Sequence, residues 1–267
     1  MEKPGENTQA NKAFTKQSAI FDVYYRPSPI VQYKRERVYQ TLSEFLPKNS
    51  RILELNSGTA EDAIWLAHQG HKVLATDVSP GMIAQQKAKI AVENLSDKID
   101  SRELSFLDLD QLPEENFDAV FSNFGGLNCT DKLDSVLRGV AQKVKSGGVA
   151  CLVVMPPNCL WEWFYALKGN FKMAFRRWKK GGTKAHIEGE YFKTFYYKPS
   201  FIKNNLPGFT HLKTEALCLA VPPEFLRKYA ERFPRIFRFL KWKESLIKSW
   251  PVVRNWGDYF IIVLRAQ

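Results

Sequence analysis

The sequence predicts an α/β fold in which a doubly wound, Rossmann-like sheet carries helical insertions. Between residues 48 and 155, short apolar runs alternate with helical patterns over short links, as in a parallel sheet covered on both faces. A turn containing Gly58 directly follows the first apolar run. After Met155 the alternation stops, and an aromatic and basic stretch begins. Right-handed crossovers in such a sheet place the carboxyl ends of the strands, and therefore the ligand, at one edge.

The expected elements follow the chain in order. Apolar runs bounded by turn residues predict strands over residues 51–55, 72–76, 104–107, 117–121, 149–155, 210–219 and 258–264. Helical spacing predicts helices over residues 31–46, 60–70, 79–92, 131–145 and 199–206. Thr59, Ser79 and Asp131 are expected to cap three of these helices, with Pro80 at the first helical position after Ser79.

Charge divides the chain into two parts. Residues 156–256 hold 20 basic and 7 acidic side chains, whereas the rest of the chain holds 19 basic and 21 acidic ones. Six of the seven tryptophans lie in the same basic stretch, namely Trp161, Trp163, Trp178, Trp242, Trp250 and Trp256. The near-neutral part and the basic, aromatic part therefore need separate explanations.

Cysteine usage favours a reducing compartment. Cys129, Cys151, Cys159 and Cys218 form no Cys-x-x-Cys pair, and two of them lie in expected strands. We therefore expect buried free thiols, with neither disulfides nor a metal site. Residues 1–12 are polar and unlike a secretory signal, and no apolar run is long enough to cross a bilayer. Together these observations predict a cytoplasmic protein.

The turn after the first strand, Leu53–Ala60, has the form of a ligand-binding turn, because glycine lets the backbone approach a ligand at a helix N-terminus. Taken alone, it also fits an NAD-type turn or a simple strand–helix connection. No Lys or Arg lies between residues 52 and 70, so a pyrophosphate or triphosphate would be poorly bound there. Glu54, Glu61 and Asp62 suit S-adenosylmethionine instead, because it carries a sulfonium and an ammonium and no phosphate.

Asp77 supplies the second indication of an adenosine ligand. It ends the second strand, 23 residues after Glu54. A carboxylate at this position can accept both hydroxyls of a ribose. A helix cap or a turn residue is the alternative role for Asp77.

Residues 50–155 resemble the class I S-adenosylmethionine-dependent methyltransferase family in five segments that occur in order and at suitable spacing. The segments are Leu53–Ala60, Thr76–Met82, Phe106–Asp108, Phe117–Asn123 and Ser146–Gly148. In the family, the acidic residue of the third segment reaches the adenine amino group, and the last residues of the fourth face the methyl-transfer site. The first segment departs from the family pattern, because Asn56 and Ala60 stand where glycines are usual and only Gly58 remains.

The resemblance implies S-adenosylmethionine as the cofactor. The residues expected to bind it are Tyr25, Glu54, Asn56, Gly58, Ala60, Asp77, Val78, Met82, Leu107, Asp108 and Asn123. Tyr24 or Tyr25 would close over the methionine end of the cofactor, as an N-terminal aromatic segment does in many such enzymes. Packing of these two rings on the sheet is the alternative.

The resemblance also implies a sheet of about seven strands whose last strand is antiparallel. The chain then divides into a disordered tail (1–12), an N-terminal helical cap (13–47), a cofactor-binding core (48–155), and acceptor and lid insertions together with strands six and seven (156–267). Six aromatic residues of the first insertion are expected to line an acceptor cavity or to form a satellite core: Trp161, Trp163, Phe164, Tyr165, Phe171 and Phe175.

Two basic segments of the insertions leave the choice of partner open. Arg176–Lys180 could face solvent, nucleic acid, an anionic membrane or an acidic carrier protein. Residues 235–250 form an amphipathic pattern with a basic fringe, and a helix packed on the core is the simplest interpretation. An acidic carrier protein or the inner membrane surface is the alternative partner of the 156–256 region. Nucleic acid is not expected, because no recognisable nucleic-acid-binding module is present.

The predicted reaction is in-line methyl transfer, in which positioning and exclusion of water provide most of the catalysis. We expect O-methylation of a hydrophobic small molecule or a lipid-like biosynthetic intermediate, with N- and C-methylation left open. His186, near Glu188 and Tyr191, is the candidate general base, and Asn123 and Asn128 are candidates to orient the acceptor.

Two other functions remain as alternatives. One is a methyltransferase-like binding protein without catalysis. The other is an NAD-dependent or nucleotide-sugar Rossmann enzyme. The missing phosphate-binding loop disfavours the latter, and so does the lack of any tyrosine followed four residues later by a lysine.

Overall fold

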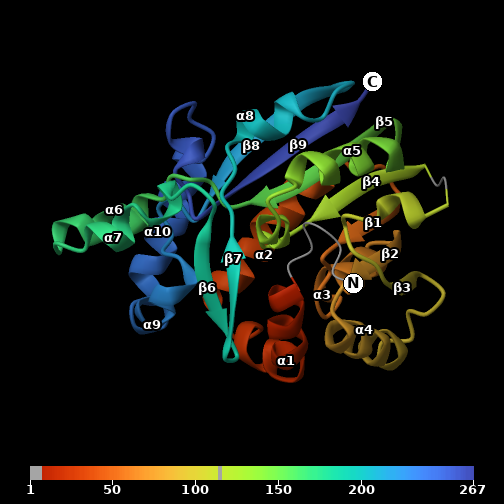
Figure 1. Cartoon of the computed structure of the whole chain (residues 1–267), viewed down its shortest axis with the longest axis horizontal. Helices are drawn as coiled ribbons and strands as arrows, with labels where there is room; N and C mark the ends of the chain where they lie inside the picture. The colour runs from red at the N-terminus through yellow and green to blue at the C-terminus, as the bar shows by residue number, and fades with distance from the viewer. Residues whose placement is uncertain (1–7, 114–115) are drawn as a thin grey trace.

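The computed structural model describes residues 8–113 and 116–267 and contains a seven-stranded sheet in the order β3-β2-β1-β4-β5-β9-β8 (Figure 1). Its strands are β1 (Arg51–Leu55), β2 (Lys72–Asp77), β3 (Ile99–Glu103), β4 (Phe117–Ser122), β5 (Val144–Val154), β8 (Phe209–Leu217) and β9 (Tyr259–Ala266). Strands β1 to β5 run parallel, whereas β9 is antiparallel to both β5 and β8. The predicted α/β fold with an antiparallel last strand is therefore confirmed.

The helices and a small hairpin surround this sheet. The helices are α1 (Thr8–Tyr25), α2 (Pro29–Ser43), α3 (Glu61–His68), α4 (Pro80–Val92), α5 (Leu133–Lys143), α6 (Leu160–Leu167), α7 (Phe171–Ala174), α8 (Pro199–Asn204), α9 (Arg227–Arg232) and α10 (Pro234–Ile247). The hairpin pairs β6 (Thr183–Ile187) with β7 (Glu190–Thr194). Within the described residues, no helix combines the length and the apolar character that a membrane span needs.

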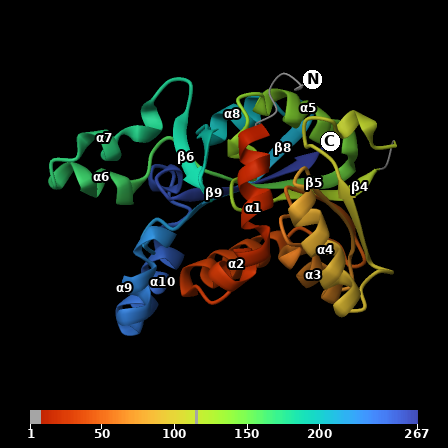
Figure 2. The ribbon, with the colours of Figure 1, turned by 60° about the horizontal axis from the view of Figure 1, so that its bottom comes forward.

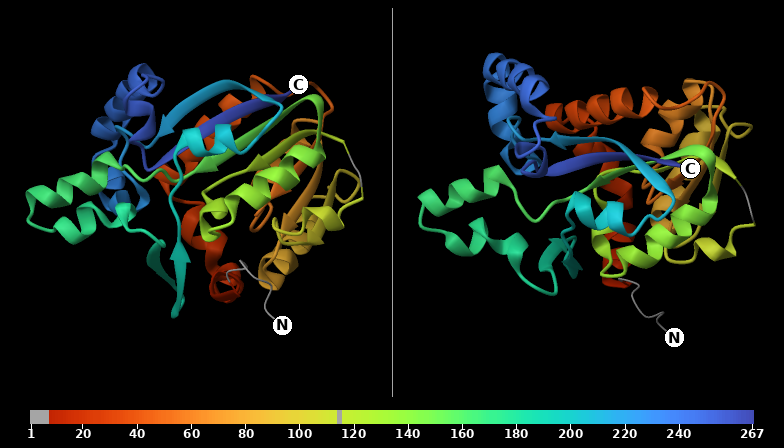
Figure 3. Two further views of the ribbon diagram at one scale, coloured as in Figure 1. Left: turned by 45° about the horizontal axis from the view of Figure 1, so that its top comes forward. Right: turned by 90° about the horizontal axis from the view of Figure 1, so that it is seen from above.

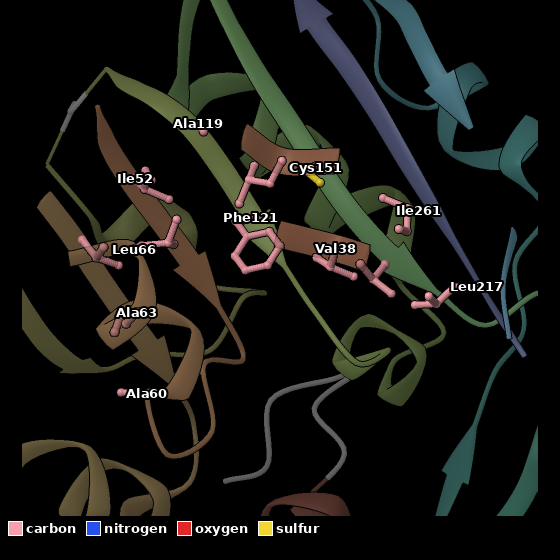
Figure 4. Close-up of a cluster of buried hydrophobic side chains, with 14 of the residues drawn as sticks. Val38, Ile52, Ala60, Ala63, Leu66, Ala119, Phe121, Cys151, Leu217 and Ile261 are labelled. Carbon is pink, nitrogen blue, oxygen red and sulfur yellow. The ribbon is translucent and has the colours of Figure 1, made fainter. Parts of the chain in front are cut away.

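Helices cover both faces of the sheet. On one face, α2 and α3 pack against alternate strand residues, and Figure 4 shows Val38, Leu66 and Phe121 in this cluster. On the other face, α5 and α8 pack against the intervening residues, including Leu53. Because successive residues of a strand face opposite layers, both layers require apolar side chains, which explains the continuous apolar runs of the sequence.

The predicted position of the third strand is wrong. The structure forms β3 at Ile99–Glu103, whereas residues 104–107 belong to the loop that follows it. Strand β3 lies at the edge of the sheet and pairs only with β2, so its polar residues remain partly exposed and give no apolar run. The apolar side chains of Leu104, Phe106 and Leu107 instead pack on the core from the loop.

The structure contains one of the three predicted N-terminal helix caps. Ser79 caps α4 as predicted, because its hydroxyl accepts a hydrogen bond from the Met82 amide at 3.3 Å. Thr59 does not cap α3; its hydroxyl donates instead to the Asp22 carboxylate at 2.6 Å. Asp131 does not cap α5 either, because Lys132 occupies the cap position and no side chain caps the helix there.

Two segment boundaries also differ from the prediction. The fifth strand begins at Val144 rather than at residue 149, because Val144 already pairs with Phe117 of β4 before an irregularity, after which the pairing resumes at Val149. The expected tail is helical from Thr8, since Ala10 and Ala13 are buried beside Phe192 of the hairpin. Residues 1–7 of the expected tail lie outside the described residues.

The insertions leave the sheet at its carboxyl edge. Helices α6 and α7 and the β6–β7 hairpin follow β5, whereas α9 and α10 follow β8, which runs parallel to β5. Figures 1 and 3 show α6, α7, α9 and α10 projecting at one end of the molecule. The hairpin folds back instead against α1, where the rings of Phe14 and Phe192 lie 5.7 Å apart.

Candidate cofactor site

A cavity lies at the carboxyl ends of β1, β2 and β4 and is covered by α1. Seven of the predicted cofactor residues line it, namely Asn56, Gly58, Asp77, Val78, Met82, Leu107 and Asn123. The structure therefore brings together, at one edge, residues that are as far as 67 positions apart in the sequence.

Asp77 is held by the two turns that flank it. One carboxylate oxygen accepts from the Gly58 amide at 2.9 Å, and the other accepts from the Ser79 amide at 2.9 Å. Burial raises the pKa of Asp77 to about 6, although the backbone amides oppose this shift. Each carboxylate oxygen can accept more than one hydrogen bond, so Asp77 still has acceptor capacity for ligand hydroxyls.

Gly58 and Asn56 shape the turn after β1. Gly58 has a φ of +56°, and a Cβ built on it would meet no protein atom within 4 Å. Asn56 also has a positive φ of 47°, a conformation that asparagine tolerates better than most residues. Its side-chain amide donates to the Asn123 carbonyl at 3.0 Å and accepts from the Ser122 hydroxyl at 2.6 Å. The asparagine that replaces a usual glycine is thus fixed to the end of β4.

Gly126 completes this arrangement on the loop after β4. A Cβ at Gly126 would lie 2.3 Å from Cγ of Asn56, so the two side chains exclude each other. Ala60, the other departure from the family pattern, is fully buried with a φ of 63° and does not line the cavity (Figure 4). Asn56 therefore contacts the site directly, whereas Ala60 supports it from the core.

Glu54 lies buried below the turn and does not line the cavity. Burial raises its pKa well above the ordinary value, Asp62 adds to the shift, and Arg35 opposes it. Its Oε2 atom has no hydrogen-bond partner among the described residues. Burial without a hydrogen-bond partner therefore favours the protonated, neutral form of Glu54.

Asp62 accepts hydrogen bonds that fix the part of the cavity wall next to Glu54. One of its oxygens accepts from the Arg35 guanidinium at 3.0 Å and from the Tyr39 hydroxyl at 2.6 Å. The other accepts from the Asn123 side-chain amide at 2.9 Å. Asn123 is consequently held in place at the cavity wall. Arg35 is the only basic side chain among the described lining residues. The sequence pattern does not distinguish Arg35 from Lys34 or Arg37 on the same helix as a residue of the site.

Helix α1 closes the cavity through residues that the sequence did not identify. Asn11, Phe14 and Phe21 line the cavity, whereas Tyr25 lies in a neighbouring hollow, where its ring packs 4.7 Å from that of Phe21. The Asp22 carboxylate fixes the helix by accepting from Lys89 at 2.8 Å. Phe14 and Phe21 therefore cover the cavity from α1, and Tyr25, which is expected over the methionine end of the cofactor, lines the neighbouring hollow.

Three further predicted residues lie outside the lining. His186 is exposed on β6 and packs 4.5 Å from the Tyr191 ring. Asn128 is buried, and its side-chain amide donates to the carbonyls of Met155 and Phe195 and so supports the loop after β4. Asp108 follows the lining residue Leu107 and precedes a short 3-10 turn. The structure gives none of the three a direct place at the cavity.

The aromatic residues of the first insertion do not form the expected acceptor cavity. Trp161 lines a separate groove against α9 and α10, and the rings of Trp163 and Trp256 lie 5.4 Å apart. The sequence also gave no sign that Cys129 lines the cofactor cavity. Burial raises the pKa of the Cys129 thiol to about 12, so the thiol remains neutral.

The sheet order and the cavity define a Rossmann-like protein that binds its ligand at the carboxyl edge of the sheet. Residues 52–148 match the model of a family described as a methyltransferase domain. This match, the five segments and the sheet order are consistent with the class I S-adenosylmethionine-dependent methyltransferase family.

Curated relatives carry related names. The demethylmenaquinone methyltransferase of Bacteroides fragilis is 33% identical over 121 residues, which cover 43% of this chain and 46% of that protein. The ubiquinone/menaquinone biosynthesis C-methyltransferase UbiE of Xanthomonas oryzae is 29% identical over 133 residues, which cover 48% and 51%. The chain therefore spans about half the length of these relatives. The solved structure of the cyclase SpnF shares the fold, with a TM-score of 0.64 at 15% identity over 100% of this chain and 99% of that one.

S-adenosylmethionine, the cofactor of this family, suits the residues present. Asp77 offers acceptors for the ribose hydroxyls, and Val78, Met82 and Phe106 offer apolar contacts for the adenine. Arg35 can pair with the methionine carboxylate. Among the described residues, Asp77 has no ion-pair partner within 4 Å, so its carboxylate also favours a cationic ligand in the cavity.

Proposed function

We propose that this chain transfers the methyl group of S-adenosylmethionine to an oxygen of a hydrophobic small molecule or a lipid-like biosynthetic intermediate. The observation that carries the proposal is one cavity in which Asp77, Gly58 and Arg35 meet the aromatic cover of α1. The acidic and basic groups suit the cofactor, and the rings of Phe14, Phe21 and Phe124 suit an apolar acceptor.

The residues of the chain contribute mainly by positioning the reactants and by excluding water from the cavity. The bound cofactor supplies an electrophilic methyl group on its sulfonium. Asp77 and Arg35 orient the two ends of the cofactor, and α1 excludes water above it, so the protein lowers the barrier chiefly by alignment. Asn123, held by Asp62, retains one amide hydrogen and one oxygen lone pair with which to orient an acceptor hydroxyl.

The cavity favours an acceptor with an acidic hydroxyl, such as a hydroxylated aromatic ring. No histidine is found among the described residues that line it, and His186 lies elsewhere. A phenol needs little assistance beyond deprotonation, whereas an aliphatic alcohol would require a strong general base. A positive sulfonium beside the acceptor also favours the ionised phenol.

Transfer to a ring carbon is a second candidate reaction. One relative is named as a C-methyltransferase, which favours this alternative. The same ionised ring that presents a reactive oxygen also carries negative charge on its neighbouring carbons. Oxygen and carbon acceptors therefore share the binding site and differ in the position of the attacked atom.

The test uses S-adenosylmethionine with a 13C-labelled methyl group and a panel of hydroxylated aromatic and prenylated acceptors. The proposal predicts labelled products whose new carbon has the NMR shift of a methoxy group. A ring-methyl shift would establish the second candidate instead. Cofactor binding without label transfer to any acceptor would overturn both reactions and favour a binding protein without methyl transfer.

A further inference from the structure

Exposed apolar side chains gather on two helical arms. The first arm comprises α6, α7 and the 3-10 turn Arg176–Trp178, and the second comprises the 3-10 turn Glu224–Leu226 with α9 and α10. On the first arm the exposed residues are Phe164, Leu167, Phe171, Phe175 and Trp178. On the second arm they are Phe225, Tyr229, Phe233, Ile236, Phe239, Trp242 and Leu246. So many exposed large apolar side chains within two segments indicate a surface that meets an apolar environment.

Helix α10 shows that this exposure is built into the fold. Its outward face carries a continuous stripe at helical spacing, formed by Ile236, Phe239, Trp242 and Leu246. The opposite face packs on the core through Phe237 and Leu240. Glu244 on that inner face accepts hydrogen bonds from four consecutive backbone amides, beginning with Cys218, at 2.8 to 3.0 Å. These bonds fix the rotation of the helix and keep the apolar stripe outside.

The first arm is anchored in a similar way. The buried Glu162 accepts from Arg176 at 2.7 Å and from Arg177 at 2.9 Å. Arg177 in turn donates to the Asp258 carboxylate at 2.7 Å, which ties the arm to the start of β9. The ion pairs hold the base of the arm, while Leu167 near its tip is 83% exposed.

The two arms form one continuous end of the molecule. The rings of Tyr165 and Phe225 lie 6.2 Å apart across the arms, and Trp161 shares an apolar groove with Phe233 and Leu240. Figures 2 and 3 show both arms extending in the same general direction, away from α3 and α4. The apolar side chains therefore belong to a single projecting surface.

Basic residues accompany the apolar ones. Residues 160–180 contain six basic side chains and one acidic side chain, Glu162, which is buried. The exposed basic residues of the two arms include Lys168, Lys172, Arg235, Arg238 and Lys243, and the exposed Lys179 and Lys180 directly follow the first arm. Aromatic side chains beside lysine and arginine are typical of helices that lie in the interface of an anionic membrane.

We propose that the two arms insert their exposed apolar side chains into the interfacial region of an anionic lipid bilayer. Projecting helices with apolar tips match a deformable bilayer better than the flat surface of an acidic protein. Both arms leave the sheet at its carboxyl edge, where the cofactor cavity also lies. The docking itself does not depend on methyl transfer.

Vesicle flotation of the full chain tests this proposal. The probes are phosphatidylcholine vesicles with and without 30% phosphatidylglycerol, at low and at high salt. We expect flotation with the anionic vesicles at low salt and weaker flotation when salt is raised or the anionic lipid is omitted. The Trp242→Ser/Leu246→Ser variant should lower the vesicle affinity on the order of a hundredfold, because two apolar anchors are lost.

Two matched variants complete the experiment. Val92→Ser removes an apolar residue of α4, outside the arms, that is more exposed than Trp242 or Leu246, and this variant should float like the wild type. Arg238→Gln/Lys243→Gln should weaken binding about twentyfold at low salt through loss of two charges. Both arm variants should retain the S-adenosylmethionine affinity of the wild type, so a failure of docking is distinguishable from a failure of the cofactor site.

Several results would overturn the proposal. Absence of flotation at low salt would do so, and so would unchanged flotation of Trp242→Ser/Leu246→Ser. Flotation that depends on the charges alone would assign the arms to a surface contact without insertion. A dimer that the same variant converts to a monomer, without any flotation, would assign the surface to a second copy of the chain.

Discussion

The core and the arms contain apolar residues in comparable abundance, but they place them differently. In residues 48–155, apolar side chains alternate between two helix-covered faces. Among the described residues of this range, Val92 is the only large apolar side chain that is exposed. Fifteen of the nineteen exposed large apolar side chains among the described residues lie between residues 156 and 256. The core therefore uses its apolar residues for stability, whereas the arms keep theirs available for contact.

The same substitution should lower the stability of the fold much more in the core than in the arms. Phe121→Ala removes a fully buried ring from the core and should lower the free energy of unfolding by about 3–5 kcal/mol. Phe239→Ala removes a half-exposed ring and should change it by less than about 0.5 kcal/mol. Chemical denaturation monitored by circular dichroism measures both values. Equal losses would show that Phe239 packs in the folded protein and would remove the contrast between the regions.

The cofactor site should respond most strongly at Asp77. Asp77→Ala removes the acceptors proposed for the ribose and should weaken S-adenosylmethionine binding at least about a hundredfold, since hydrogen bonds to charged groups are worth about 1.5–3 kcal/mol each. Asp100→Ala removes an exposed carboxylate from the edge strand β3 and serves as the control. Calorimetric titration measures both affinities. Unchanged affinity in Asp77→Ala would separate this carboxylate from the cofactor.

Asn56 and Gly126 should behave as a coupled pair. Gly126→Ala places a methyl group against the Asn56 side chain and should lower the free energy of unfolding by about 1–3 kcal/mol. Asn56→Gly provides the missing space, so the double variant should recover most of the loss. Additive losses in a double-mutant cycle would contradict the proposed contact.

The affinity for the cofactor should depend on pH with a defined sign. The pKa of Asp77 is raised to about 6, so the carboxylate is ionised above this pH and becomes protonated as the pH falls through it. The affinity should therefore fall below pH 6, by up to about tenfold for each further unit. Asp77→Asn should flatten the profile. A profile that Glu54→Gln flattens instead would assign the titration to Glu54, whose pKa burial also raises.

Sequence patterns identified those parts of the fold and the site that depend on local spacing. Strands β1, β2 and β4 give apolar runs because they are buried on both faces, and Asp77 could be recognised because it ends such a strand. Strand β3 gave no such run, since an edge strand tolerates polar residues. The carboxyl-edge rule then sufficed to group Asn56, Gly58 and Asp77 in one cavity.

The rest of the site depends on tertiary contacts that leave no local pattern. Arg35 lies on a helix among other basic residues, and only its packing beside Asp62 separates it from them. Phe14 covers the cavity because α1 packs on the hairpin more than 170 residues further along the chain. The neighbours of His186 in the sequence favour a general base, but the hairpin leaves its side chain exposed to solvent. Such positions are determined by how distant elements pack.

Calorimetric titration of the full chain with S-adenosylmethionine, S-adenosylhomocysteine and NAD tests the central claim most directly. The cavity geometry predicts saturable one-site binding of the first two ligands and no binding of NAD, because Arg35 is the only described basic residue in the lining available to a pyrophosphate. Saturable binding of NAD without binding of S-adenosylmethionine would contradict the account.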